Sequence, residues 1–287
     1  MRMINTAPEL TVFRCFGDDA EVFLQSQFTS DICAISNGGW SLSGYCSPKG
    51  RLLAVFFVCR RENEFLVSTH ESLADSVIAR LRMYVMRADV SFELLSGQQL
   101  AFHDNRAGGA DVSHDHSDSF SPQTLLDIST IDAITTEEAS SALSFETVCI
   151  ELGLPLISGP LSEVLIPQSV NLDLVGGVSF KKGCYPGQEI VARVRYRGKP
   201  KQRMIRAIAE HTGRPEPGTH IRVATATSGR DGVVICAAAA DTPGEIQLLA
   251  AVPTEVVNPL GSGSLFWGDI PLTVSTLPYP IPAEAPG

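Results

Sequence analysis

The texture of the sequence changes near residue 200, and this change limits the folds that the chain can adopt. Beyond it, short apolar runs alternate with Gly- and Pro-containing turns such as 213–218 (GRPEPG) and 258–263 (NPLGSG). Several short strands at such spacing are typical of a small barrel or sandwich. We therefore predict a separate β unit over 201–287, with strands over 204–209, 220–224, 232–238, 245–252 and 270–274.

The first 200 residues mix helical and extended patterns, which favours an α+β fold. A strand, the turn Ser47-Pro48-Lys49-Gly50 and a return strand form a predicted hairpin over 40–59. Further predicted elements are helices over 18–30, 73–84 and 137–152, strands over 64–68, 90–95 and 99–103, and a loop over 104–123. We expect two α+β subdomains in 1–200, with a flexible loop near 104–123.

Composition excludes several classes of protein. The chain of 287 residues carries a formal charge of −10, which argues against a general nucleic-acid binder. The longest apolar run covers 52–59, whereas a membrane helix needs about 20 residues. The seven cysteines contain no C-x-x-C spacing, and no apolar leader precedes the first elements, so we expect no intrinsic metal site and a cytoplasmic protein with free thiols.

Positive charge is concentrated in one segment of this acidic chain. Residues 181–203 contain eight of the 22 basic residues and one acidic residue, Glu189, so the segment carries +7 and the remainder −17. A solvated charged face is the common alternative, but such concentration in an acidic protein indicates that an anion is bound there.

Cys184 lies within this basic segment, in a turn bounded by Gly and Pro. Two lysines and the start of a following helix would place positive potential near its thiol and lower the thiol pKa. That is the requirement for a nucleophile or a metal ligand, although a buried, inert cysteine stays an open alternative. We assign that inert role to the other six, Cys15, Cys33, Cys46, Cys59, Cys149 and Cys236.

The run FKKGCYPGQEIVAR at 180–193 resembles the K-G-C-Y-x-G-Q-E signature of YgfZ-type folate-binding proteins, which are relatives of the glycine-cleavage T-protein. Agreement extends to Pro167-Gln168, Asn171-Leu172, Gly176-Gly177 and Tyr196-Arg197-Gly198. Looser agreement is found at Phe23-Leu24-Gln25, Asp31-Ile32 and the 47–51 turn.

This resemblance implies an α+β fold: a T-protein-like ring of folate-binding subdomains with ferredoxin-like elements, followed by a small C-terminal β-barrel. The central cavity would receive tetrahydrofolate or a derivative. The implied role is to assemble or repair iron–sulfur clusters in client proteins, together with assembly proteins, and so to support tRNA modification indirectly.

The resemblance also implies roles for individual residues. Cys184 is the functional thiol and a possible transient ligand to cluster iron. The remaining motif and anion-binding candidates are Lys182, Tyr185, Gln188, Glu189, Arg193 and Arg197. The candidates for the folate cavity are Gln168, Asn171 and Lys181.

Two alternatives remain. A folate-dependent aminomethyltransferase is disfavoured because the segment 149–153 lacks the Arg of the related T-protein and 65–70 lacks its catalytic Asp. A protein that binds tRNA directly is disfavoured because only Tyr185 and Tyr196 accompany the basic residues, which leaves little surface for base stacking. Whether the folate is a reactant or only a ligand stays open.

Overall fold

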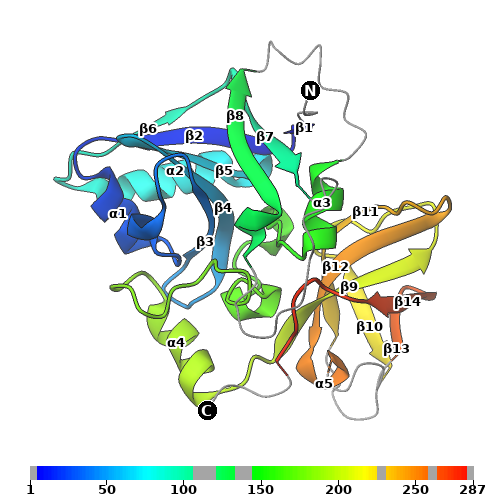
Figure 1. Ribbon diagram of the computed structural model, residues 1–287. Helices are drawn as coiled ribbons and strands as arrows, with labels where there is room; N and C mark the ends of the chain where they lie inside the picture. Colours follow the sequence, from blue (N-terminus) through cyan, green and yellow to red (C-terminus); the bar gives the residue numbers. More distant parts are fainter. Residues whose placement is uncertain (1–4, 106–120, 133–143, 225–230, 258–263, 283–287) are drawn as a thin grey trace.

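A five-stranded antiparallel sheet forms the centre of the N-terminal part of the protein in the computed structural model (Figure 1). The structure describes residues 5–105, 121–132, 144–224, 231–257 and 264–282. The sheet has the order β3-β4-β5-β2-β6. The bounds of its strands are β2 Leu10–Phe16, β3 Trp40–Cys46, β4 Leu52–Arg61, β5 Glu64–His70 and β6 Ser91–Leu94.

Two helices accompany this sheet. Helix α2, Glu71–Val85, contacts β2, β4, β5 and β6, and buries Leu73, Val77 and Leu81 at helical spacing. The prediction of a helix over 73–84 is confirmed. Helix α1, Ala20–Gln27, is shorter than the predicted 18–30, because Phe28 turns to extended backbone and pairs with Tyr45 of β3.

Aromatic side chains fill the core of the sheet. The rings of Phe28 and Phe56 lie 4.6 Å apart, and Phe13 meets Phe56 edge-on at 6.2 Å. Tyr45 completes the group, 6.1 Å from Phe28. All four are fully buried, and edge-on or tilted pairs at these distances add to the free energy gained from burial. The core therefore fixes the chain at Phe28, where helix α1 ends.

A smaller sheet and helix α3 join this part to the rest. The strands β1 (Asn5–Ala7), β7 (Gln98–Asp104) and β8 (Leu126–Asp132) form the order β1-β7-β8. In α3, Phe145–Leu152, the ring of Phe145 packs on Phe57 and Phe102 at 5.2 and 4.9 Å. The helix predicted over 137–152 is confirmed over 145–152. Its earlier residues up to 143, and 106–120 of the predicted loop, lie outside the described residues.

The C-terminal part is a closed six-stranded barrel with the order β10-β11-β12-β9-β14-β13. Its strands are β9 Gln202–Glu210, β10 His220–Ala224, β11 Gly232–Ala239, β12 Glu245–Pro253, β13 Ser264–Trp267 and β14 Ile270–Ser275. A short helix, α5 (Thr254–Val257), follows β12. The predicted fold class, α+β with a small C-terminal barrel, is confirmed, and β13 is a strand that the sequence did not predict.

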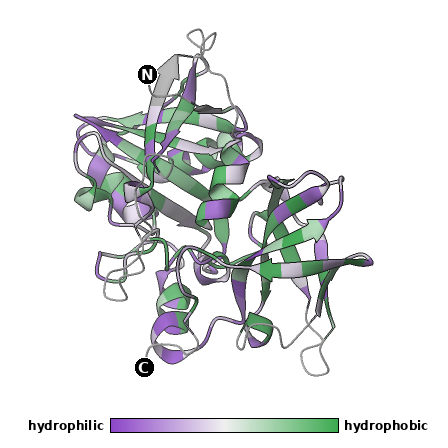
Figure 2. Ribbon diagram, turned by 45° about the vertical axis from the view of Figure 1, so that its right-hand side comes forward, coloured by the Kyte–Doolittle hydropathy of each residue, from purple (hydrophilic) through white to green (hydrophobic). Residues whose placement is uncertain are grey.

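The barrel shares one wall with the rest of the molecule. On β12, Ile246, Leu248 and Ala250 point into the barrel core, whereas Leu249 and Ala251 belong to the main hydrophobic core. Helix α3 contacts β11 and β12 on that outer side. Figure 2 shows the hydrophobic residues concentrated along the strands of the sheet and the barrel alike. Among the described residues, none of the helices combines the length and apolarity that a membrane crossing requires.

Buried polar groups tie the barrel to the preceding loops. The Arg203 guanidinium on β9 donates from Nη1 to Asp173 Oδ1 at 2.7 Å and from Nη2 to Oδ2 at 3.1 Å. Tyr279, beyond the last strand, donates its hydroxyl proton to the carbonyl of Gly153 at 2.7 Å. The connection between the two parts therefore contains directional bonds as well as apolar contacts.

Two half-buried carboxyl groups lie at this connection, and they predict a pH dependence of stability. Burial raises the pKa of Glu9, and repulsion from Glu146 adds to the shift despite an opposing backbone hydrogen bond. Burial also raises the pKa of Glu146, against the attraction of Arg214. A raised pKa means that the folded state holds the proton more tightly than the unfolded state. The resulting stabilisation is complete at low pH and is lost as the pH rises through the folded-state pKa.

We therefore expect Glu9→Gln to raise the melting temperature at pH 7 and to flatten its decline between about pH 4.5, the usual glutamate value, and neutrality. Thermal unfolding across this pH range measures both effects. Glu62→Gln is the matched control, since Glu62 is exposed in the β4–β5 turn and should change neither quantity. A Glu9→Gln protein with the pH profile of the native chain would contradict the prediction.

Candidate functional site

The segment around Cys184 is anchored to the end of helix α1. The backbone N–H of Ser179 donates to the carbonyl of Thr29 at 2.8 Å, and Thr29 Oγ1 donates to the carbonyl of Gly177 at 2.5 Å. The same hydroxyl oxygen accepts from the N–H of Gly44 on β3 at 2.7 Å. We call residues 176–187 the motif loop. Thr29 thus fixes the start of the motif loop against the edge of the large sheet.

Lys182 makes the second attachment. Its ammonium group donates to the carbonyls of Phe28 and Ser30 at 2.6 and 2.9 Å, and lies 5.5 Å from the centre of the Tyr185 ring. Burial lowers the pKa of Lys182 to about 8, although nearby Asp31 favours the charged form. The side chain therefore acts as a clamp between the motif loop and the segment 28–31.

Two glycines make the third attachment. Gly187 has φ +78°, and a Cβ there would lie 2.5 Å from the carbonyl oxygen of Ser47. Gly50, with φ +69°, faces Ile190 in the same way. The turn predicted at 47–50 therefore touches the end of the motif loop, and only glycine permits this approach at Gly187. Helix α4, Gln188–Arg197, begins directly after this contact.

Cys184 is exposed at the outer side of the motif loop, whereas its neighbour Tyr185 is buried. Burial raises the pKa of the Tyr185 hydroxyl, so this residue stays neutral and supports the loop. The inert, buried role assigned to Cys33 is wrong, because Cys33 is exposed. It lies in the short 3-10 turn Ile32–Ala34, of which only Ile32 points into the core. The remaining five cysteines are buried as predicted.

Gln168 and Asn171, two candidates for the folate cavity, are both buried and bonded to backbone. Gln168 Nε2 donates to the carbonyl of Val191 in α4 at 2.8 Å. Asn171 pairs with Met204 of β9: its Nδ2 donates to the carbonyl at 2.8 Å and its Oδ1 accepts from the N–H at 3.2 Å. These contacts join Gln168 to α4 and Asn171 to strand β9 of the barrel.

The other candidates lie along the motif loop and α4. Gln188 and Glu189 occupy the first turn of the helix, and Arg193 and Arg197 are exposed further along it. Lys181 is exposed on the motif loop. Of the ten residues of α4, all of which the structure describes, Val191 is the buried one. The helix stands out from the body of the protein, as Figure 1 shows.

A cavity of about 300 Å³ opens beside the motif loop. Gly176 and Ser179 of the loop line it together with Trp40 of β3. Its polar lining residues are Asp31, Ser36, Ser41, Ser121, Gln123 and Ser179. Sequence reasoning did not select Trp40 or the serines. Two features of the sequence could have indicated this cavity: the rarity of Trp, with two in the chain, and the loose family agreement at Asp31.

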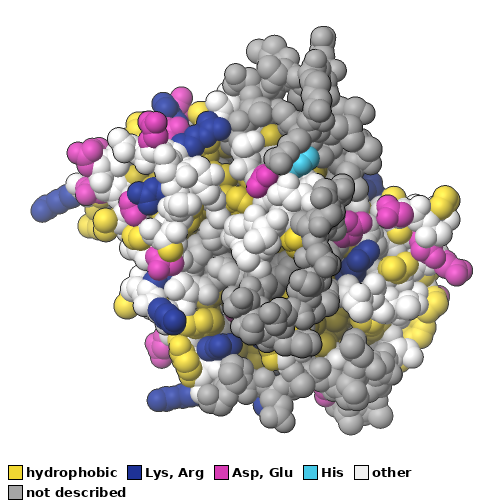
Figure 3. Space-filling model, viewed as in Figure 1, with side chains coloured by type: hydrophobic (Ala, Val, Ile, Leu, Met, Phe, Trp, Pro, Cys, Tyr) yellow, Lys and Arg dark blue, Asp and Glu magenta, His cyan; other side chains and the backbone are white. Residues whose placement is uncertain are grey.

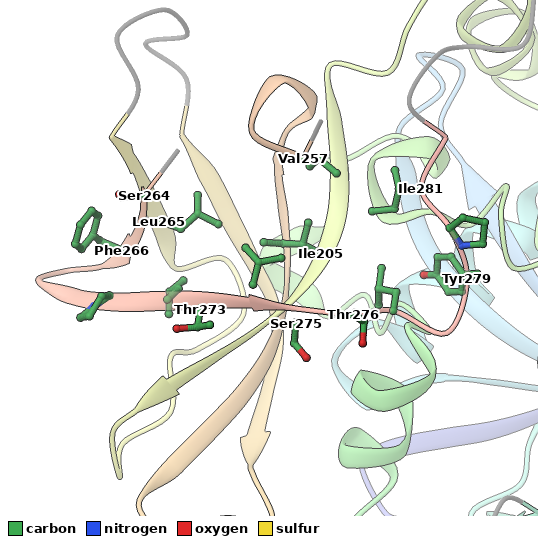
Figure 4. A pocket seen from close by; sticks show the side chains of 15 residues that line it. Ile205, Val257, Ser264, Leu265, Phe266, Thr273, Ser275, Thr276, Tyr279 and Ile281 are labelled. Carbon is green, nitrogen blue, oxygen red and sulfur yellow. The ribbon is translucent and has the colours of Figure 1, made fainter. Parts of the chain in front are cut away.

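A second cavity, of about 720 Å³, lies at the barrel and contains no residue of the motif loop (Figure 4). Its lining comes from β9, β13, β14 and the segment that follows, including Ile205, Leu265, Tyr279 and Ile281. In the part of the chain that the structure describes, no three His, Cys, Asp or Glu side chains are grouped as a metal site needs.

Comparison with known proteins gives the relationship of this chain. No family model matches it. It is 30% identical to the tRNA-modifying protein YgfZ of Cronobacter sakazakii, an alignment that covers 92% of this chain and 88% of that protein. It is 28% identical to the tRNA-modifying protein YgfZ of Aliivibrio fischeri, over 84% of this chain and 81% of the relative.

Among solved structures, the chain is similar to the glycine cleavage system aminomethyltransferase T from Bartonella henselae. The TM-score is 0.67 at 14% sequence identity, and the match covers 96% of this chain and 85% of the other. The fold is therefore that of the aminomethyltransferases. Among proteins of this fold, the chain belongs to the YgfZ family.

Proposed function

We propose that this protein binds tetrahydrofolate or a derivative and acts as an accessory factor that assembles or repairs iron–sulfur clusters in client proteins. Through those clients it would support tRNA modification, the activity in the names of its relatives. One observation carries the proposal: an exposed thiol, Cys184, is held on a loop that also lines a cavity. The proposed location is the cytoplasm, where reducing conditions keep thiols free.

The cavity beside the motif loop suits the pterin end of a folate. Carboxylate, hydroxyl and amide groups line it, and these accept from and donate to the N–H, amino and carbonyl groups of a pterin. Trp40 is held in place because its Nε1 donates to the carbonyl of Leu126 at 2.9 Å. A Cβ at Gly176 would meet nothing within 4 Å, so the side of the cavity formed by Gly176 leaves space for a ligand. A bound reduced folate would supply a carrier for one-carbon units.

Cys184 supplies the chemistry toward the cluster. A thiolate is the usual protein ligand for cluster iron, and one thiolate cannot hold a cluster alone. Cys184 would therefore share the cluster with ligands from a client, an assembly protein or a small thiol. Its exposure on a clamped loop permits that contact, because the loop need not rearrange to present the sulfur.

Replacing Cys184 with Ala should remove most of the client activity while folding and tetrahydrofolate affinity persist, because the side chain is exposed. Client activity is measured as the content of cluster-dependent modified nucleosides in tRNA from cells that carry only the variant. Affinity is measured by anaerobic calorimetry.

Cys33→Ala is the matched control, since Cys33 is the other exposed cysteine, and it should leave the nucleoside content unchanged. Full client activity in Cys184→Ala would show that the Cys184 thiol is not required for the proposed function. Folate-dependent release of ammonia from an aminomethyl-lipoyl carrier by the native protein would identify an aminomethyltransferase instead.

A further inference from the structure

The eight basic residues of 181–203 divide into two groups. Lys182 is bound to backbone carbonyls and Arg203 to Asp173, so neither offers its charge to a ligand. The other six make no ion pair with any residue that the structure describes: Lys181, Arg193, Arg195, Arg197, Lys199 and Lys201. Glu189 is the one acidic residue in the same stretch. A surface of unpaired cations on a protein of net charge −10 calls for an anionic occupant.

These cations are close together in space. Arg193, Arg195 and Arg197 lie on α4, and Lys199 and Lys201 lie just after it. Figure 3 shows Lys and Arg atoms at the lower left, where Figure 1 places this helix. We call this set of six residues the α4 basic surface. Because α4 is exposed on most sides, its arginines keep their forked donors available to carboxylates.

The α4 basic surface is joined to the cavity beside the motif loop. Ser179 lines that cavity, and the next residue, Phe180, packs edge-on against the Tyr196 ring at 6.1 Å. The Arg195 guanidinium lies 5.3 Å from the centre of the Phe180 ring. One residue therefore separates the cavity wall from the cationic helix, and a ligand that extends out of the cavity on this side would reach α4 directly.

We infer that the α4 basic surface binds the γ-linked polyglutamate tail of the folate, and that the ligands of this protein are polyglutamylated folates. The inference rests on the proposed function. Each added glutamate brings one more carboxylate, and exposed pairs of this kind change affinity by about two- to fivefold each. The affinity should therefore increase with tail length, and salt should reduce the increase because exposed charges are screened.

The test compares monoglutamyl and pentaglutamyl tetrahydrofolate by anaerobic calorimetry at low and high salt. We expect the native protein to bind the pentaglutamate at least about tenfold more tightly at low salt. In Arg193→Gln/Arg197→Gln, the ratio of the two dissociation constants should fall toward one. Arg87→Gln/Arg222→Gln removes two exposed arginines elsewhere and should keep the native ratio.

The outcomes separate the inference from the proposed function. Failure of the native protein to bind either folate would overturn the proposed function itself. Equal binding of both folates would leave the proposed function standing and overturn the inference, as would a native ratio in Arg193→Gln/Arg197→Gln. Low-salt binding of an RNA oligonucleotide that this variant loses, together with equal binding of both folates, would assign the α4 basic surface to RNA.

Discussion

Replacing Asp173 with Ala should lower the free energy of unfolding by about 3–5 kcal/mol, because it leaves the Arg203 charge buried without its partner. The side chains of Asp173 and Arg203 are only 2% and 8% exposed. Arg203 also donates to the carbonyl of Gln168 at 3.0 Å, so it cannot swing into solvent without breaking a second bond. Chemical denaturation of the native and variant chains measures the loss.

Two comparisons isolate the burial effect. Glu93→Ala breaks the exposed pair with Arg14 and should cost far less than Asp173→Ala, because solvent screens an exposed ion pair. The double variant Asp173→Leu/Arg203→Met removes both charges and should recover much of the loss, since apolar pairs often replace buried ion pairs without penalty. Equal losses in Asp173→Ala and Glu93→Ala would show that the buried pair has no special importance.

Replacing Gly187 with Ala should cost about 2–5 kcal/mol and displace the motif loop. A left-handed backbone costs an alanine roughly 1–2 kcal/mol, and overpacking adds about 1–3 kcal/mol. Here the added carbon would lie 2.5 Å from the Ser47 carbonyl oxygen and 2.7 Å from the Gly50 Cα, both of which are backbone atoms. Loss of this contact would free the loop that carries Cys184, so client activity should fall together with stability.

Gly176→Ala is the matched control for this change. Gly176 has nearly the same φ, +80° against +78°, but a Cβ there meets nothing within 4 Å. It should therefore show the backbone cost of about 1–2 kcal/mol alone. Thermal and chemical denaturation of both variants separates the two contributions. If both alanines cost the same, the close approach at Ser47 does not hold the motif loop.

The sequence predicted those helices and strands whose apolar residues recur at one regular spacing along the element. The hairpin of β3 and β4, the helix α2 and most barrel strands have one consistent spacing of apolar residues. Strand β2 was not predicted, although it lies inside the large sheet, between β5 and β6. It carries Arg14, which pairs with Glu93 of the neighbouring strand at the surface. This charged residue interrupts the run of apolar residues by which a buried strand is recognised in a sequence.

The sequence indicated where a candidate site lies, but it did not predict the contacts that the structure shows there. The charge concentration indicated residues 181–203, and the family signature indicated residues 180–193. Neither could show that Lys182 and Arg203 use their charges internally, because their partners are backbone carbonyls at 28 and 30 and the distant Asp173. The exposure of Cys33 depends on the short turn after Asp31, and no periodic pattern marks a turn of three residues.

The wall that the barrel shares with the main core limits the amino-acid substitutions that this chain can accept during evolution. Residues of β12 are constrained from two sides, since Leu248 must fit its neighbours inside the barrel and Leu249 must fit α3 and the core around it. A substitution on either side can be absorbed only if the strand keeps its position for the other. The strands along this wall should therefore change slowly in evolution, whereas the exposed positions of β10 and β13, such as His220, Arg222 and Ser264, are free to diversify.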